Sequence, residues 1–328
     1  MPKFETVYVI GKFSPLHNGH EHVIRTAQQN CSQVVLLSWS LPEFDGCSAE
    51  ARLRWLETVF PDCIALVIGS KAVEKFDFSP PPANDASDQV QRNYTFNIIK
   101  MADLPPPDAV FSSEAYGLGL SQSLQEAFIR NVSHVSVDFD RTQFPISGTD
   151  IRADVHTHRE YLSPDVYASF VNSVCFVGAE STGKSTLSER LAADMKTPRV
   201  EEYGRTLWVE RGGELDFEDY LHIAETHIEM EEAAKRKANR FIFVDTTPLT
   251  TLFYSKEHTG RVDPKLIELS NRRYDVTFLC HPDFPMVQDG WRGEESFRQA
   301  QHEWYLKELA ALQIDFVSLL GTLEEKIA

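Results

Sequence analysis

Cysteine, long apolar runs and positive charge are all scarce in this sequence. The 328 residues include five cysteines, far apart and without a C-x-x-C pair, which argues against a disulfide framework and a cysteine zinc site. No apolar run approaches the ~20 residues that cross a bilayer, and the first residues lack the basic-then-apolar pattern of a secretory signal. We therefore expect a cytoplasmic protein with no membrane partner.

The charge balance is strongly acidic, with a formal net charge of −17. Nucleic-acid binders usually carry a basic surface, so we expect no nucleic-acid partner. Anionic small molecules are repelled at long range, so a nucleotide site must gather basic residues locally. A hydrophobic content of 42% is ordinary for a globular protein, and the length allows two domains and is compatible with a homo-oligomer.

Short apolar runs alternate with helical patterns in both halves of the chain. This alternation predicts an α/β fold whose parallel sheets are covered on both faces. Two domains are expected, at residues 1–152 and 173–328, joined by a linker at 153–172 that has no long periodic run. The strands are expected at residues 7–10, 33–38, 64–68, 109–111 and 132–137, and then at 174–177, 241–244 and 276–279.

The first chemical motif is G-K-F-S-P-L-H-N-G-H, from Gly11 to His20, directly after an apolar strand. A turn there, followed by a helix start, gathers backbone N–H groups where a phosphate can sit. His17 and His20 are three residues apart and can face that point, and Lys12 adds a fixed positive charge. The group suits displacement at an α-phosphate without a protein nucleophile. The alternatives are half of a metal site and ordinary surface residues.

A second element, I-S-G-T-D-I-R, ends the first half. Ser147 and Thr149 offer hydroxyls and a helix cap, and Arg152 can fork onto phosphate oxygens. Together the two strings resemble the nucleotidyltransferase superfamily, which transfers AMP or CMP from a nucleoside triphosphate. The resemblance implies that the two histidines and this Ser/Thr/Arg element hold the triphosphate, in a Rossmann-like domain.

The second half opens with a full P-loop pattern, G-x-x-x-x-G-K-S, from Gly178 to Ser185, between an apolar run and a helical one. Lys184 is expected to reach the β- and γ-phosphates of ATP, and Ser185 to bind Mg²⁺. Asp245 ends an apolar strand as a Walker B carboxylate does, although a helix-capping Asp looks the same. This half is therefore expected to be a P-loop kinase domain.

Two further strings carry site-like residues. Glu202, Tyr203 and Arg205 combine a carboxylate, an aromatic ring and a guanidinium, which suits a ribose and a flat base, although an ordinary turn also fits. The string D-G-W-R-G at 289–293, with Arg298 beyond it, resembles a lid that brings Arg292 to the transferring phosphoryl group. A plain surface loop is the alternative.

These strings together resemble the NadR-type bifunctional enzymes, with an adenylyltransferase domain followed by a ribosylnicotinamide kinase domain. The resemblance implies that the kinase makes nicotinamide mononucleotide (NMN) from the riboside, and that the other domain joins NMN to AMP from ATP, giving NAD and pyrophosphate. The strings that carry it are 51–56, 110–114, 146–152, 178–186, 202–205 and 244–246.

The resemblance also assigns site residues. Catalytic roles fall to Lys12, His17, His20, Arg152, Lys184, Glu202 and Asp245. Nucleotide binding falls to Gly11, Phe13, Gly19, Ser147, Thr149, Glu180, Ser181, Thr182, Gly183, Lys184, Ser185, Thr186 and Arg292. Substrate binding falls to Arg54, Trp55, Glu114, Tyr203 and Arg205, and metal binding to Ser185 and Asp245.

The chain departs from the family pattern in two places. The first strand starts near Thr6, which leaves no room for the N-terminal helix-turn-helix of some members. The family pattern also has an acidic residue two positions after the Walker B Asp, where this chain has Thr247. The kinase general base therefore stays open between Asp245 and Glu202.

Two other functions stay open. A fusion of pantetheine-phosphate adenylyltransferase with dephospho-coenzyme A kinase has the same two fold types in the same order. A nucleotide-sensing regulator without turnover is favoured by Thr247 but disfavoured by the intact His17, His20, Lys184 and Ser185.

Overall fold

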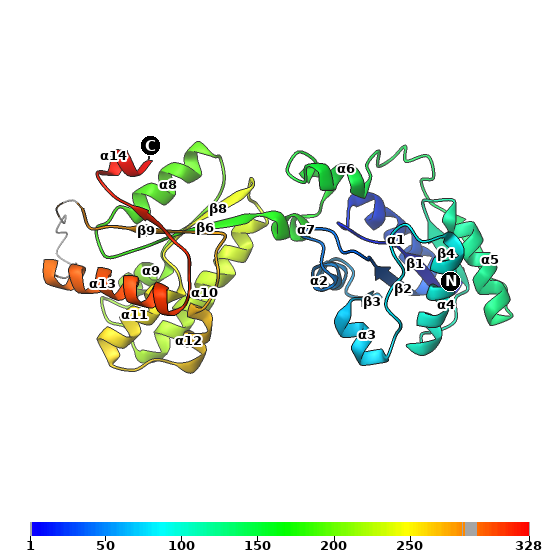
Figure 1. Cartoon of the computed structure of the whole chain (residues 1–328), viewed down its shortest axis with the longest axis horizontal. Helices are drawn as coiled ribbons and strands as arrows, with labels where there is room; N and C mark the ends of the chain where they lie inside the picture. The colour runs from blue at the N-terminus through cyan, green and yellow to red at the C-terminus, as the bar shows by residue number, and fades with distance from the viewer. Residues whose placement is uncertain (1, 284, 286–293, 328) are drawn as a thin grey trace. The chain divides into compact units, whose positions relative to one another are not determined.

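The computed structural model describes residues 2–283, 285 and 294–327, and the chain divides into two compact units, Met1–Phe170 and Val171–Ala328 (Figure 1). Each unit contains a five-stranded sheet whose paired strands all run parallel. The predicted α/β class is confirmed. Among the described residues, no helix combines the length and apolar character that crossing a membrane requires.

The first unit has its strands in the order β3-β2-β1-β4-β5. Its elements are β1 (Phe4–Ile10), α1 (Asn18–Asn30), β2 (Cys31–Trp39), α2 (Ala49–Val59), β3 (Ile64–Ile68), α3 (Ser70–Phe76), α4 (Asp88–Met101), β4 (Ala109–Ser112), α5 (Tyr116–Phe128), β5 (Ser133–Ser136), α6 (Gly148–Ala153), η1 (Arg159–Tyr161), α7 (Pro164–Tyr167) and η2 (Ala168–Phe170).

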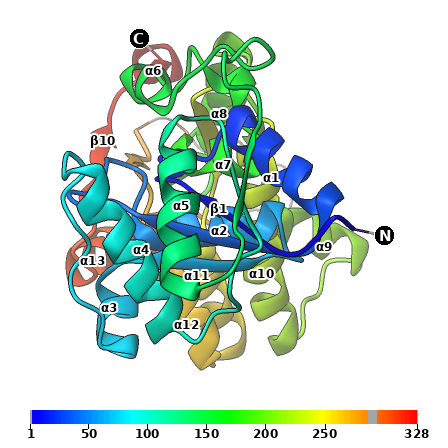
Figure 2. The same ribbon diagram turned by 90° about the vertical axis from the view of Figure 1, so that its right-hand side faces the viewer.

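The strand order of the first unit reverses at β1. The chain builds β2 and β3 on one side of β1, then returns to build β4 and β5 on the other. Ligands of open α/β sheets bind at the carboxyl ends of the strands where such a reversal occurs. The loop that starts at Gly11 leaves β1 at this point. One hydrophobic cluster joins Tyr8 and Val35 of the sheet to Ile98 of α4 and Leu120 of α5, which lie side by side (Figures 1 and 2).

The second unit has its strands in the order β10-β9-β6-β8-β7. Its elements are β6 (Asn172–Val177), α8 (Lys184–Asp194), β7 (Arg199–Val200), α9 (Tyr203–Glu210), α10 (Phe217–Lys235), β8 (Phe241–Asp245), α11 (Pro248–Thr259), α12 (Pro264–Ser270), β9 (Val276–Cys280), α13 (Glu295–Ala311), β10 (Val317–Leu319) and α14 (Leu323–Ile327).

The second sheet, like the first, has a reversal of strand order next to its first strand. Its order reverses at β6, and the P-loop follows that strand directly. Phe176 of β6 is paired in register with Asp245 of β8, so the Asp lies one strand away from the loop. Phe176 also packs against Phe243 and Leu187, which fixes α8 on the sheet. The start of α8 and the end of β8 therefore meet at one edge of the sheet.

Residues 159–170 form short helices within the first unit. Val166 and Tyr167 are buried, and Phe170 packs on Trp55 of α2 with ring centroids 5.7 Å apart. The Trp55 indole is 1% exposed and donates a hydrogen bond to Ser169 Oγ at 2.8 Å. The domain limits of 1–152 and 173–328 stay a prediction, and these contacts give it a direct test.

We predict that a fragment ending at residue 170 is more stable than one ending at residue 152. The shorter fragment exposes Trp55 and loses the burial of Val166 and Tyr167. Burying one large apolar side chain contributes about 1.5–3 kcal/mol, against a net stability of roughly 5–15 kcal/mol for a whole domain. Urea unfolding followed by tryptophan fluorescence measures this difference, and equal midpoints for the two fragments would contradict it.

Candidate active sites

The first candidate site surrounds the two histidines at the start of α1. Their rings stack with centroids 3.7 Å apart and planes 27° apart, and the His17 backbone N–H approaches His20 Nδ1 at 3.5 Å. His17 Nδ1 is buried and has no hydrogen-bond partner among the described residues. A buried polar atom without a partner is rare in folded proteins and is often found where a ligand binds.

Both histidines are neutral at neutral pH. Burial lowers the pKa of His17 to about 4, and the charges of Arg141 and Arg152 act in the same direction. Desolvation, followed by His17 and then Arg141, holds the pKa of His20 well below its ordinary value. A neutral imidazole offers one N–H donor and one acceptor. The pair can therefore hydrogen-bond a phosphate while the charge of the site comes from other groups.

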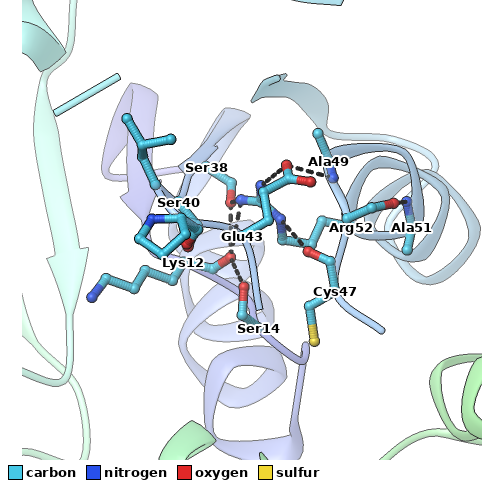
Figure 3. Close-up of polar contacts among 12 residues, drawn as sticks. Lys12, Ser14, Ser38, Ser40, Glu43, Cys47, Ala49, Ala51 and Arg52 are labelled. Carbon is cyan, nitrogen blue, oxygen red and sulfur yellow. Dashed lines mark hydrogen bonds and ion pairs between the residues drawn. The ribbon is translucent and has the colours of Figure 1, made fainter. Parts of the chain in front are cut away.

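The backbone of the same loop is fixed at the Lys12 carbonyl (Figure 3). That oxygen accepts hydrogen bonds from Ser14 Oγ at 3.0 Å, Ser38 Oγ at 2.9 Å and Arg52 Nη1 at 3.4 Å. The Lys12 side chain is exposed, and its Nζ donates to the carbonyl of Asn84 at 3.3 Å. Desolvation, and then the charge of Arg152, lower the pKa of Lys12. Two cations therefore share this edge of the sheet.

Arg52 is the centre of this network and was missed by the sequence analysis. Its side chain is fully buried and donates to Ser38 Oγ at 2.7 Å, Cys47 O at 3.1 Å and Glu43 Oε1 at 3.0 Å (Figure 3). Glu43 also accepts from the Ala49 N–H at 2.8 Å. Arg52 thereby ties the β1 loop, β2 and the start of α2 together. Its sequence signal is its place on the buried face of α2, three residues before Trp55.

The element at 146–152 meets the first loop through Arg152. Its Nη1 donates to the Ser14 carbonyl, its Nη2 donates to Thr149 Oγ1 at 3.0 Å, and the guanidinium lies 3.9 Å from the centroid of Phe44. Ser147 caps α6, with its Oγ accepting from the Asp150 N–H at 3.2 Å. The two motifs that the sequence analysis grouped therefore lie together in the first unit.

The residues with expected substrate roles in this unit have protein partners. Trp55 is buried against Ser169, whose Oγ also accepts from Arg54 Nη2 at 3.3 Å. Glu114, just after β4, forms an ion pair with Arg141 at 3.1 Å. In this conformation Trp55 presents no open face to a ligand, and the substrate contacts of all three stay a prediction.

The second candidate site is the P-loop between β6 and α8. Gly178 has φ +140°, and a Cβ there would lie 2.5 Å from the Cys280 carbonyl oxygen, so only glycine fits. Ser181 and Gly183 also have positive φ, which bends the loop back on itself. Such turns aim successive N–H groups inward and form an anion cradle. Lys184 Nζ folds across the loop to the carbonyls of Gly178 at 2.9 Å and Ala179 at 2.8 Å.

Two helices hold the P-loop in place. The Glu180 N–H donates to Gln301 Oε1 at 2.9 Å, and Glu180 Oε1 accepts from the Tyr254 hydroxyl at 2.8 Å. Arg298, which is 1% exposed, donates to the carbonyls of Glu180 and Ser181, each at 3.1 Å. Arg298 was expected beside a lid, but its guanidinium is hydrogen-bonded to the P-loop backbone. Residues 289–293, with Arg292, lie outside the described residues.

Three further residues were expected to bind nucleotide at the P-loop: Thr182, Ser185 and Thr186. Thr182 is buried and its Oγ1 donates to the Ala179 carbonyl at 2.9 Å. Ser185 and Thr186, in the first turn of α8, are exposed. The hydroxyl of Ser185 is therefore accessible to a ligand held in the cradle.

Two carboxyl groups lie beside the P-loop. Asp245 is 1% exposed; its Oδ2 accepts from Arg199 at 2.8 Å, and its Oδ1 has no hydrogen-bond partner among the described residues. Desolvation raises the pKa of Glu202, while the charge of Lys184 opposes that rise. A carboxyl group whose pKa is raised is a better proton acceptor once ionised. The structure thus gives the two groups different environments.

The segment after Asp245 is held in an unusual conformation. Thr246 has φ +69°, which β-branched residues rarely adopt, and its N–H donates to the Phe176 carbonyl at 3.1 Å. Strain of this kind persists where the surroundings enforce it and is concentrated at functional sites. Thr247 is buried at the N-cap of α11.

Two residues with expected substrate roles lie on α9. The Tyr203 hydroxyl lies 3.4 Å from His222 Nε2, and Arg205 is exposed.

Comparison with known proteins gives the family. The trifunctional NAD biosynthesis/regulator protein NadR of Escherichia coli (strain K12) is 30% identical over 330 residues, covering 94% of this chain and 77% of that protein. The protein of the same name in Salmonella typhimurium gives the same identity and coverage. The chain belongs to the NadR family. A family model for an AAA domain also matches residues 173–326.

Two solved NadR structures share this fold along nearly the whole chain. The complex with NR has a TM-score of 0.69 at 20% identity and covers 97% of this chain and 90% of its own. The complex with NAD and AMP-PNP has a TM-score of 0.69 at 20% identity, with coverages of 99% and 94%. As in the NadR family, a Rossmann-like nucleotidyltransferase unit precedes a P-loop kinase unit.

We predict that Arg52→Met destabilises the first unit by about 3 kcal/mol, because it removes a fully buried guanidinium and leaves Ser38 Oγ and the Cys47 carbonyl without its hydrogen bonds. Arg54→Met, two residues along the same helix, is the matched control. Arg54 makes one exposed hydrogen bond, so its loss should cost less than about 1 kcal/mol. Denaturant unfolding of the full chain measures both, and equal effects would contradict the role given to Arg52.

Proposed function

We propose that this chain carries out two steps of NAD biosynthesis. The second unit phosphorylates nicotinamide riboside with ATP and gives NMN. The first unit adenylylates NMN with a second ATP and gives NAD and pyrophosphate. NadR-family membership supports the proposal, and the observation that carries it is a separate phosphate cradle in each unit, after β1 and after β6. Cytoplasmic location and small-molecule partners belong to the same proposal.

In the first unit the protein positions charge and supplies no nucleophile. A phosphate oxygen of NMN attacks the α-phosphorus of ATP, and the bond from that phosphorus to the pyrophosphate breaks. Lys12 and Arg152 balance the negative charge that develops on the phosphoryl oxygens. Neutral His17 and His20 donate hydrogen bonds to the same group, and the Arg52 network keeps the loop in place.

In the second unit the P-loop amides and Lys184 hold the β- and γ-phosphates of ATP. Lys184 leaves the carbonyls of Gly178 and Ala179 for the phosphate oxygens. Asp245 Oδ1 and the Ser185 hydroxyl are the oxygen donors that fit Mg²⁺, a hard cation that neutralises phosphate charge when bound.

Glu202 is our choice for the group that accepts the proton of the riboside hydroxyl. Its pKa is raised, whereas one oxygen of Asp245 is already held by Arg199. The riboside oxygen then attacks the γ-phosphorus, and ADP leaves. Thr247 supplies no carboxylate, so this division of roles leaves Asp245 to the metal.

His20→Ala should lower the rate of NAD formation from NMN and MgATP by roughly 10²-fold or more. This is the scale of losing one hydrogen-bond donor aimed at a transition state. NMN formation from the riboside should be unchanged, which provides the internal control. A folded variant that makes NAD at the wild-type rate would remove His20 from the mechanism.

Lys184→Ala should abolish NMN formation and spare NAD formation from supplied NMN, because the lost ammonium neutralises phosphate charge in the second site only. Lys307→Ala, which removes an exposed lysine of α13, should leave both rates unchanged. Chromatographic assay of NMN and NAD measures the two activities. If the wild-type chain binds ATP yet forms no NMN, the second unit is the nucleotide sensor that Thr247 favours.

A further inference from the structure

An arginine outside the P-loop bonds to the carboxylate at the end of β8. Arg199 lies on the short edge strand β7, where it pairs in register with Phe243, two residues before Asp245. Its Nη2 donates to Asp245 Oδ2 at 2.8 Å. The side chains of Arg199 and Asp245 are 18% and 1% exposed. The pair is therefore largely removed from water, where an ionic contact is strong and its loss is costly.

Asp245 is the main partner of this arginine. The carboxylates of Glu189 and Glu201 lie 3.8 Å from Arg199 Nη1, beyond hydrogen-bond distance, and both side chains are more than 70% exposed. Strand β7 is itself anchored, since Thr197 Oγ1 accepts from the Asn239 N–H at 2.9 Å and donates to the Phe241 carbonyl. A strand held in this way places the Arg199 guanidinium beside Asp245.

The contact with Arg199 occupies one of the two carboxylate oxygens of Asp245, Oδ2. Asp245 Oδ1 is buried and has no hydrogen-bond partner in the part of the chain that the structure describes. Two positions later Thr247 supplies a hydroxyl in place of a second carboxylate. The orientation of the one carboxylate at the end of β8 then depends on the arginine, and so does the charge that it presents.

We propose that Arg199 is a positioning residue of the second site. It holds Oδ2 of Asp245, so that Oδ1 stays the oxygen offered to a bound cation, and its positive charge weakens the attraction between that carboxylate and the cation. This inference rests on the proposed kinase function of the second unit. It extends that function to a residue on β7, outside the P-loop sequence.

Removing the guanidinium then has two opposite effects. The carboxylate gains negative potential, which tightens cation binding. It also loses its fixed orientation, which slows a reaction that depends on positioning. An ion pair with a purely structural role predicts a lower melting temperature with unchanged metal dependence. The combination of tighter metal binding and slower turnover distinguishes the two roles.

The binding experiment uses the full chain with ADP at fixed concentration and increasing MgCl₂, and follows the melting temperature. Lys184→Ala serves as the blank for ADP and metal bound elsewhere. Arg199→Met should lower the half-saturating Mg²⁺ concentration at least about threefold, since a unit charge beside the carboxylate is removed. The control is Arg190→Met, which removes a surface arginine of α8 paired with Asp194 and should match the wild type.

The turnover experiment measures NMN formation from riboside and MgATP. Arg199→Met should lower kcat roughly 10-fold or more, with the KM for ATP within about threefold of the wild type. NAD formation from NMN, in the other unit, should not change. Arg199→Lys keeps the charge but not the planar fork. It should keep the wild-type Mg²⁺ dependence within about twofold and still turn over more slowly.

The outcomes separate the two proposals. If the wild-type chain forms no NMN, the kinase function fails, while the Mg²⁺ titration with ADP still decides the role of Arg199. If Arg199→Met only lowers the melting temperature, with Mg²⁺ dependence and turnover unchanged, the positioning role is overturned. If that variant does not fold, Arg199→Lys decides, because wild-type turnover in it overturns the same claim.

Discussion

The carboxyl end of the central strand in each sheet is the constraint on which the rest of this molecule depends. β1 and β6 each have neighbours on both sides, and the strand order reverses there. The chain must turn after the strand and start a helix, which directs free N–H groups to one point. In each unit a charged side chain reaches that point from a neighbouring segment. It is Arg152 in the first unit and Asp245 in the second.

Electrostatics explains why each site needs such a fixed frame. The chain carries a net charge of −17, so its surface does not attract anions at long range. The positive charges that bind phosphate must be held close together; desolvation, and then the charge of Arg152, lower the pKa of Lys12. Neutral His17 and His20 add donors without adding further repulsion. Buried hydrogen bonds, above all those of Arg52, keep this arrangement in place.

Most of the fold could be predicted from the sequence because buried parallel strands are continuous apolar runs. All the predicted strands overlap observed ones, and both phosphate loops follow the first strand of their sheets. Helices α3, α4 and α5 of the first unit were not predicted, and in α5 the residues Gly117 and Gly119 weaken the helical pattern. The edge strand β7 has only two residues, Arg199–Val200, too few to form a recognisable apolar pattern.

The site was predictable where its residues are close in sequence and hidden where they are far apart. The P-loop and the string from Gly11 to His20 are local patterns. Arg199 is 46 residues from Asp245, and Arg298 is 118 residues from Glu180, so sequence spacing carries no sign of either contact. Arg52 was passed over in favour of Arg54 and Trp55, because a charged side chain is ordinarily expected to face solvent even at helical spacing from a buried residue.

The most direct test of two successive reactions in one chain is a time course with nicotinamide riboside labelled in the pyridine ring. The full-length protein is given the labelled riboside and excess MgATP, and the label is followed by chromatography. We expect it to appear first in NMN and then in NAD, with one pyrophosphate released for each NAD formed. Label that stays in the riboside, or that stops at NMN, would contradict the account.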